Sequence, residues 1–227
     1  MYDTNIFNEL KTKGYYSFEL NNQDELNLLD KIHTICSNIN YTSAVHTGIE
    51  GNNYSKDIEY ETLEKIKETA KINNAWQFWY QSNDLHFYLN TEEKLFIKNI
   101  IENILYKCYP YDLINKEEEG ARNPSITMFN KKCYINPHVD GSNNFKLCNI
   151  LIYLNKDWEE GFGGELVVNN IKISPTFGKV AVLDFKHINT EHSVNEILND
   201  NFKRYTLITG VNCDISNNRI FIKKNIL

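Results

Sequence analysis

Hydrophobic spacing divides the chain into a helical first half and a strand-rich second half, with the change near residue 120. In residues 21–39 and 91–109, apolar side chains recur at intervals of three and four, which predicts amphipathic helices. A further helix is expected at 61–72, and the sequence GYYSFEL at 14–20 predicts a strand. The first half is therefore expected to supply mainly helices.

The two clearest helices carry start signals. Asn22 is followed three residues later by Glu25, a variant of the capping box, in which two side chains bond each other's backbone. In the second helix, Thr91 is the expected N-cap. The apolar stripe of that helix is predicted to comprise Leu95, Ile97, Ile100, Ile101, Ile104 and Leu105.

Beyond residue 120 the chain consists of short apolar segments separated by Gly, Asn and Asp turns. Strands are predicted at 124–130, 146–155, 164–169, 178–185, 192–197, 203–212 and 219–223. This spacing is typical of a sandwich or barrel. LCNILIYL (147–154) is apolar on both faces, so one face should line a cavity and the other should lie under the helices. The predicted fold class is α+β, a barrel-like double sheet buttressed by N-terminal helices.

All 227 residues are expected to form one domain. Residues 1–120 would give helical support and the substrate mouth, and 121–227 the core. The polar stretch 40–60 is predicted to be a mobile loop. WQFWY (76–80) fits core packing or a substrate wall, and KEEEG (116–120) fits a solvated loop or part of the mouth.

Charge and cysteine content narrow the function classes. The net charge is −6 and no basic cluster stands out, which argues against a nucleic-acid partner. The five cysteines are scattered without a CxxC pair, which favours reduced thiols and a cytoplasmic location over a disulfide framework or structural zinc. No secretion signal and no membrane-spanning stretch is evident, so no membrane partner is expected. The oligomeric state is not indicated.

A histidine and an aspartate stand two apart in NPHVDGSNN (136–144). If this segment is extended, His138 and Asp140 point to the same side and could bind one ion. The pair alone is weak, because HxD arises readily by chance. A second histidine would complete a 2-His-1-carboxylate face, which leaves open positions on a ferrous ion. The candidates are His187 and His192, and His192 is preferred because it opens an apparent strand.

A chelating cosubstrate on such an ion would carry a carboxylate at its far end. Arg204 suits that carboxylate because the guanidinium fork pairs with it through two bonds, and Thr206 lies on the same strand face. GFGGE (161–165) lacks the GK[ST] ending of a phosphate loop and precedes a strand, so that reading is rejected. No GxSxG nucleophile elbow occurs.

Five segments occur in a fixed order between residues 124 and 212: PHVD, LIYLNKDW, GGELVV, EHSV and RYTLITGV. Together they resemble the Fe(II)/2-oxoglutarate-dependent dioxygenases, and most closely the prolyl-4-hydroxylase-like branch. YLNKDW followed by GGxL is similar to hypoxia-inducible-factor-type prolyl hydroxylases. FNELKTKGYYSFEL (7–20) is similar to the helix and strand that begin these enzymes. The resemblance implies a double-stranded β-helix, or jelly roll.

The resemblance also implies roles for individual residues. His138, Asp140 and His192 match the iron ligands, Arg204 matches the residue that binds the distal carboxylate of 2-oxoglutarate, and Thr206 matches an assisting hydroxyl. Further positions match the cosubstrate pocket and the turn before the next strand: Tyr153, Leu166, Val194, Gly163 and Gly164.

Two features lie outside this match. Asn149 should face the same way as Leu151 and Tyr153, and is therefore a candidate cosubstrate or substrate contact. Many relatives carry a tyrosine about ten residues before the first iron histidine. Here Phe129 stands near that place, and Tyr134 is a candidate substitute.

By the resemblance, the protein would be an oxidoreductase using Fe(II), 2-oxoglutarate and dioxygen, with ascorbate as an optional addition. It would hydroxylate an unactivated C–H of a free or peptidyl amino acid or a related small metabolite, and release succinate and carbon dioxide. A carboxylate at Asp140 favours hydroxylation over halogenation, while desaturation and cyclisation stay open. The competing readings are a cupin-like metal-binding module without turnover and zinc-assisted hydrolysis, which gives Arg204 no role.

Overall fold

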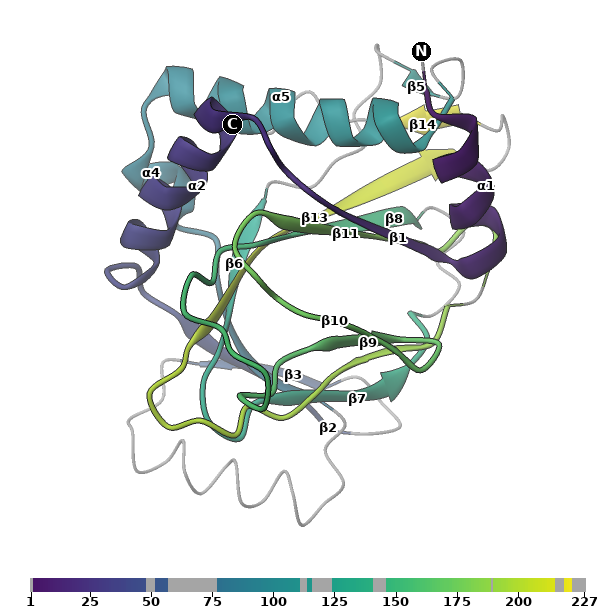
Figure 1. Cartoon of the computed structure of the whole chain (residues 1–227). Coiled ribbons are helices and arrows are strands. Elements are labelled where there is room, and N and C mark those ends of the chain that lie inside the picture. Colours follow the sequence, from purple (N-terminus) through teal and green to yellow (C-terminus); the bar gives the residue numbers. More distant parts are fainter. Residues whose placement is uncertain are drawn as a thin grey trace.

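The computed structural model shows two layers of β-strands with helices over one of them (Figure 1). The structure describes residues 2–47, 52–56, 77–110, 114–115, 124–140, 146–188, 190–214 and 219–221. The helices are α1 (Thr4–Lys13), α2 (Gln23–Cys36), α4 (Leu85–Tyr88) and α5 (Thr91–Cys108). In the described part, no helix has the length and apolar character needed to cross a bilayer.

The strands alternate with these helices in the first half and dominate the second. They are β1 (Tyr15–Glu19), β2 (Thr42–Thr47), β3 (Asn52–Lys56), β4 (Gln77–Ser82), β5 (Ile114–Asn115), β6 (Ser125–Phe129), β7 (Tyr134–His138), β8 (Lys146–Tyr153), β9 (Leu166–Val168), β10 (Ile171–Ile173), β11 (Lys179–Asp184), β12 (His192–Val194), β13 (Arg204–Asp214) and β14 (Arg219–Phe221). All seven strands predicted beyond residue 120 are present. Among the described residues, β7 and β10 in the second half and β2, β3 and β5 in the first half were not predicted. In β7 the sequence YINPH contains a proline and no alternation, so its pattern does not indicate a strand.

The strands pair in the order β1-β11-β8-β13-β6-β4-β7-β12-β9-β10. β1, β11, β8 and β13 form the layer under α1 and α5, while β7, β9 and β10 lie in the opposite layer (Figure 1). β6 and β4 connect the layers in the pairing order, and β1 and β10 end it, so the sheet is not closed. This confirms the predicted α+β fold, with a double-layered sheet buttressed on one side by N-terminal helices.

The core fills the space between helices and sheet. Ile150 and Ile152 of β8, and Leu154 directly after it, are at most 1% exposed. On α5, every residue of the predicted stripe except Leu95 is at most 2% exposed, whereas Leu95 is 53% exposed. The prediction for Leu95 is therefore wrong, because that position lies on the solvent side of the first helical turn.

The helix starts are set by asparagines. The sequence predicted Thr91 as the N-cap of α5, but the N-cap is Asn90. Asn90 Oδ1 accepts from Glu93 N–H at 2.9 Å, and the Glu93 carboxylate accepts from Asn90 N–H at 2.9 Å. Asn22 caps α2, accepting from the backbone N–H groups of Asp24 and Glu25, but the reciprocal Glu25 bond of the predicted capping box is not among the bonds described there. Both caps satisfy N–H groups that the helix leaves unpaired.

The polar stretch 40–60 contains a strand pair, contrary to the predicted loop. β2 pairs antiparallel with β3, and β2 also pairs with β4, which carries most of the WQFWY segment. The first half thus extends the sheet as well as covering it. The sequence did not indicate this strand pair, because the stretch contains Asn and Gly residues, and both types are depleted in strands. The predicted helix at 61–72 and the KEEEG segment at 116–120 lie outside the described residues.

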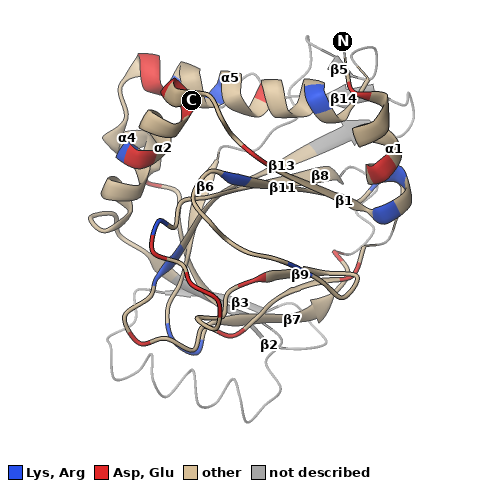
Figure 2. Ribbon diagram, in the orientation of Figure 1, with Lys and Arg blue, Asp and Glu red and all other residues tan. Residues whose placement is uncertain are grey.

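Charged residues of both signs are interspersed along the helices and loops in the view of Figure 2. Ion pairs between elements join α2 to its surroundings: Lys31 pairs with Glu93 of α5, and Asp30 pairs with Lys156. Exposed pairs of this kind each contribute about 0–1 kcal/mol. The position of α2 therefore depends more on its buried face, formed by Leu28, Leu29 and Ile32, than on these exposed ion pairs.

Candidate active site

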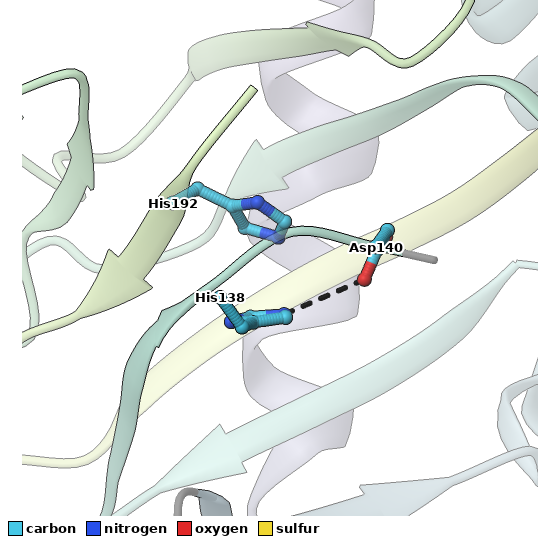
Figure 3. Close-up of side chains that lie close together, drawn as sticks. All are labelled: His138, Asp140 and His192. Atoms are coloured by element: carbon cyan, nitrogen blue, oxygen red, sulfur yellow. Dashed lines mark ion pairs between the residues drawn. The ribbon is translucent and has the colours of Figure 1, made fainter. Parts of the chain in front are cut away.

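The pair His138 and Asp140 lies close to His192, which is more than fifty residues later in the chain. His138 ends β7 and His192 begins β12, and these two residues are direct partners in the antiparallel pairing. One ligand atom each from His138, Asp140 and His192 lies within 4.8 Å of the others. The two imidazole rings are 4.3 Å apart between centroids, and His138 Nε2 lies 3.4 Å from Asp140 Oδ1 (Figure 3). The structure thus brings together the three residues that the sequence predicted as a cluster.

Both imidazoles are oriented by the carbonyl two residues earlier in the chain. His138 Nδ1 lies 2.9 Å from Asn136 O, and His192 Nδ1 lies 3.2 Å from Thr190 O. Because a carbonyl only accepts, these contacts favour the tautomer with the proton on Nδ1, in which Nε2 has the lone pair that a metal ion needs. Sequence reasoning did not find these two carbonyls, since every residue has one.

The cluster is open on one side. His192 is 8% exposed, whereas the side chains of His138 and Asp140 are 15% and 24% exposed. A buried histidine next to two accessible ligands leaves room for small molecules to reach a bound ion. Two imidazoles and one carboxylate form the donor set of non-haem Fe(II) sites with free coordination positions.

Among the side chains that the structure describes, the other histidines are not part of this cluster. His187 bonds through Nδ1 to the carboxylate of Asp184 at 2.9 Å, so the preference for His192 agrees with the geometry. His33 lies on α2 and His86 on α4. The side chain of His46 lies outside the described part.

Arg204 is buried without a counter-ion among the described residues. It opens β13 and is 1% exposed, and its Nε and Nη2 have no hydrogen-bond partner in the described structure. The guanidinium carbon lies 4.8 Å from the ring centroid of Phe129 and 5.0 Å from that of Tyr153. Burial lowers the pKa of this guanidinium, but an arginine stays charged in proteins. A buried, unpaired cation of this kind requires an anion as partner.

Two buried hydroxyls accompany this arginine. Thr206 and Tyr153 are fully buried, and neither hydroxyl has a partner among the described residues. Thr206 is the cross-strand partner of Tyr153 and stands two residues after Arg204, on the same face of β13. Burial raises the pKa of the Tyr153 phenol, which keeps it a neutral hydrogen-bond donor. A guanidinium fork and two hydroxyl donors match the acceptor oxygens of a carboxylate.

The remaining predicted pocket residues lie on the strands around this set. Leu166 and Val194 are buried cross-strand partners on β9 and β12. Asn149 is half-buried on β8, opposite Gly210 of β13. Tyr134 opens β7 and is half-buried. Phe129, which stands where relatives carry a tyrosine, places its ring against the guanidinium of Arg204.

Gly164 allows the arginine its position. Its φ is +79°, and a Cβ there would lie 2.5 Å from Ile197 Cδ1 and 3.0 Å from Arg204 Cδ. Gly161 has a similar φ of +93° but open space around its Cβ position. Substituting each glycine in turn therefore distinguishes the cost of the left-handed backbone, which both share, from the cost of contact with Ile197 and Arg204, which only Gly164 has.

We expect Gly164→Ala to lower the free energy of unfolding by more than Gly161→Ala does. In both variants the alanine must adopt a left-handed backbone, which costs about 1–2 kcal/mol. Overpacking costs a further 1–3 kcal/mol, roughly, at Gly164 only. Urea unfolding measures the difference, and titration with 2-oxoglutarate should show weaker binding for Gly164→Ala alone. Equal losses of stability and unchanged binding in both variants would contradict the proposed contact.

Comparison with known proteins agrees with this geometry. Residues 124–210 match the 2OG-Fe(II) oxygenase superfamily, and no curated protein matches the sequence significantly. Similar solved structures include a prolyl-4-hydroxylase from Pseudomonas putida, with a TM-score of 0.57, 12% identity, and coverage of 92% of this chain and 97% of that chain. A prolyl hydroxylase from Trichoplax adhaerens, in complex with a hypoxia-inducible-factor peptide fragment, has a TM-score of 0.60, 15% identity, and coverage of 94% and 89%.

A third similar structure is a non-haem, α-ketoglutarate-dependent epimerase from nogalamycin biosynthesis. Its TM-score is 0.56, with 12% identity and coverage of 92% of this chain and 81% of that chain. At these identities the structures share the fold with this chain. The superfamily match identifies residues 124–210 as a 2OG-Fe(II) oxygenase domain. The matched segment contains the His138, Asp140 and His192 cluster, and the match indicates an enzyme that uses Fe(II), 2-oxoglutarate and dioxygen.

Proposed function

We propose that this enzyme hydroxylates an unactivated C–H bond of an amino acid, free or peptidyl, or of a related small metabolite, and releases succinate and carbon dioxide. The observation that carries the proposal is the convergence of His138, Asp140 and His192 within 4.8 Å, in the same fold as a buried, unpaired Arg204. One group accounts for a metal ion and the other for an anionic cosubstrate. A metal-binding module or a hydrolase would leave the second group without a role.

In this proposal His138, Asp140 and His192 hold Fe(II) through two Nε2 atoms and a carboxylate oxygen. Bound Fe(II), with 2-oxoglutarate and dioxygen, supplies the oxidising chemistry that breaks a C–H bond. The protein's part is to orient the ligands: the carbonyls of Asn136 and Thr190 hold both imidazoles in the tautomer that leaves Nε2 free. Asp140 adds the negative charge that favours a divalent cation.

Arg204 is proposed to bind the distal carboxylate of 2-oxoglutarate, with Thr206 and Tyr153 donating hydroxyl hydrogen bonds. Nε and Nη2 of Arg204 and the two hydroxyls are buried and lack hydrogen-bond partners in the described structure, so a carboxylate would satisfy them. Leu166 and Val194 are proposed to line the apolar wall of this pocket, and Asn149 to contact the cosubstrate or the substrate. Apolar walls exclude water and strengthen the ion pair with the guanidinium.

The substrate class is the least constrained part of the proposal. The solved relatives include prolyl hydroxylases, one of them with a bound peptide fragment, and an epimerase of an antibiotic pathway. A peptidyl or free amino acid is favoured because the sequence motifs resemble the prolyl-4-hydroxylase-like branch. The four cysteines whose side chains are described are buried free thiols, which suits the proposed cytoplasmic location.

The test begins without oxygen. Adding Fe(II) and 2-oxoglutarate to the protein should produce a visible charge-transfer band, and dioxygen should then give succinate with a panel of amino acids and peptides, with and without ascorbate. A band without succinate across the panel would count against the proposed substrate class. Metal binding without any 2-oxoglutarate dependence would instead support a cupin-like binding module. Zinc-dependent hydrolysis of a panel member would support the hydrolase reading.

A further inference from the structure

The turn between β11 and β12 leads directly into His192 and contains a buried polar network. β11 ends at Asp184, which is 0% exposed, and His192 follows eight residues later. Phe185, the first residue of this turn, places its ring 5.7 Å from the His192 ring. The path of the turn therefore decides where the imidazole of His192 lies.

The carboxylate of Asp184 fixes the start of the turn. Its Oδ1 accepts from the backbone N–H groups of Lys186 at 2.9 Å and His187 at 2.7 Å. Its Oδ2 accepts from the buried phenol of Tyr109 at 2.9 Å and lies 2.9 Å from His187 Nδ1. A buried carboxylate with this many donors is held in one orientation, and charge-assisted bonds of this kind are stronger than neutral ones.

The hydroxyl of Thr190 fixes the end of the turn. Thr190 is 0% exposed, and its Oγ1 donates to Asp184 O at 3.1 Å, with the carbonyls of Gly14 and Ile188 each at 3.4 Å. The backbone carbonyl of the same residue accepts from His192 Nδ1 at 3.2 Å. Thr190 thus links the buried network to the imidazole, because its hydroxyl belongs to the network and its carbonyl accepts from His192.

The end of α1 closes this network from the other side. Gly14 O accepts from Asp184 N–H at 2.8 Å. With φ at +77°, a Cβ on Gly14 would lie 1.9 Å from Thr190 Oγ1, so the helix end and the threonine are in close contact. Gly14 lies outside the segment that matches the oxygenase superfamily, yet it contacts Thr190, whose carbonyl orients His192.

We propose that Asp184, Thr190 and Gly14 form a positioning network that holds the imidazole of His192 with its proton on Nδ1, so that Nε2 can serve as the metal ligand. The proposal rests on the proposed function in one respect, the role of His192 as an iron ligand. The three residues touch neither metal nor substrate and act through the Thr190 carbonyl. Partners of metal-bound histidines typically change metal affinity by about 10–100-fold when they are removed.

The test compares Thr190→Val with Thr190→Ser. Valine has nearly the same shape but lacks the hydroxyl, whereas serine keeps it. Nitrogen-15 NMR of the histidine rings in the metal-free protein should show the Nδ1–H tautomer of His192 in wild type and Thr190→Ser, and a mixture of tautomers in Thr190→Val. Titration with Mn(II), a probe that is stable in air, should give a dissociation constant about 10–100-fold higher for Thr190→Val than for wild type.

A second pair of variants guards against a simple loss of folding. Tyr109→Phe removes one phenol bond to Asp184, and Tyr41→Phe removes one phenol bond, of 2.9 Å, to the carbonyl of Cys36, away from the turn. Only Tyr109→Phe should weaken Mn(II) binding, by less than Thr190→Val does. If Thr190→Val and Tyr109→Phe lower the thermal midpoint but keep wild-type tautomer and Mn(II) affinity, the network is merely structural and the proposal is overturned.

The readouts separate this inference from the proposed function. If wild-type protein binds no Mn(II) or Fe(II), the proposed function fails. The tautomer of His192 in the metal-free protein still tests whether the network positions this imidazole. A mixed tautomer in metal-free wild type would overturn the network even if the enzyme is active.

Discussion

Replacing Asp140 with alanine is expected to abolish succinate release coupled to substrate oxidation. Asp140 is the one carboxylate in the three-residue cluster, and it supplies the negative charge beside the two imidazoles. Loss of a residue that merely orients a ligand costs about 10–100-fold in metal affinity, so loss of a ligand should exceed about 100-fold. Succinate assays at saturating Fe(II), together with metal titration, measure both effects.

The matched control for this variant is Asp200→Ala. Asp200 is an exposed aspartate whose side chain is 71% accessible and pairs with Lys131 at 2.6 Å, so its loss changes the net charge equally. Wild-type turnover is expected for this control. Coupled turnover near the wild-type level in Asp140→Ala would remove this aspartate from the iron site.

Replacing Arg204 with methionine is expected to weaken 2-oxoglutarate binding strongly without destabilising the free protein. The guanidinium is buried and unpaired in the described structure, so its desolvation costs several kcal/mol. Contacts with the Phe129 and Tyr153 rings return only about 0.5–2 kcal/mol each. Removing this charge should therefore leave the thermal midpoint unchanged or raise it.

The same substitution should weaken the binding of 2-oxoglutarate, although it does not destabilise the free protein. Removing one partner of a buried ion pair costs about 2–5 kcal/mol, so the dissociation constant of 2-oxoglutarate should rise at least about 30-fold. The rise of the thermal midpoint on adding 2-oxoglutarate and Mn(II) should disappear. Arg204→Lys keeps the charge but loses the two-pronged geometry, and should fall between wild type and Arg204→Met. Unchanged 2-oxoglutarate binding together with a sharp loss of stability would identify Arg204 as a structural residue.

The sequence predicted the fold where hydrophobic spacing and turn residues agree. The strands beyond residue 120 and the helices α2 and α5 follow from periodicity, since each has one face that must be buried. The β2–β3 pair was missed because its residues are polar and its order depends on the neighbouring strand β4. The N-cap of α5 was misplaced by one residue, because Asn90 and Thr91 are both good caps and only the geometry distinguishes them.

The candidate site was predictable as a set of side chains but not as a network. HxD, a later histidine and a following arginine are visible in the chain, and their order carries the resemblance. The carbonyls that orient His138 and His192, the aromatic rings around Arg204 and the buried carboxylate of Asp184 depend on contacts between distant segments. Backbone groups and apolar rings occur throughout any chain, so no pattern marks the ones that matter.

Anomalous diffraction at the iron edge, from crystals grown with Fe(II) and 2-oxoglutarate without oxygen, addresses the central claim most directly. A single iron peak is expected within bonding distance of His138 Nε2, His192 Nε2 and a carboxylate oxygen of Asp140, with 2-oxoglutarate reaching from that peak to Arg204. An iron peak elsewhere, or 2-oxoglutarate bound away from Arg204, would contradict the account.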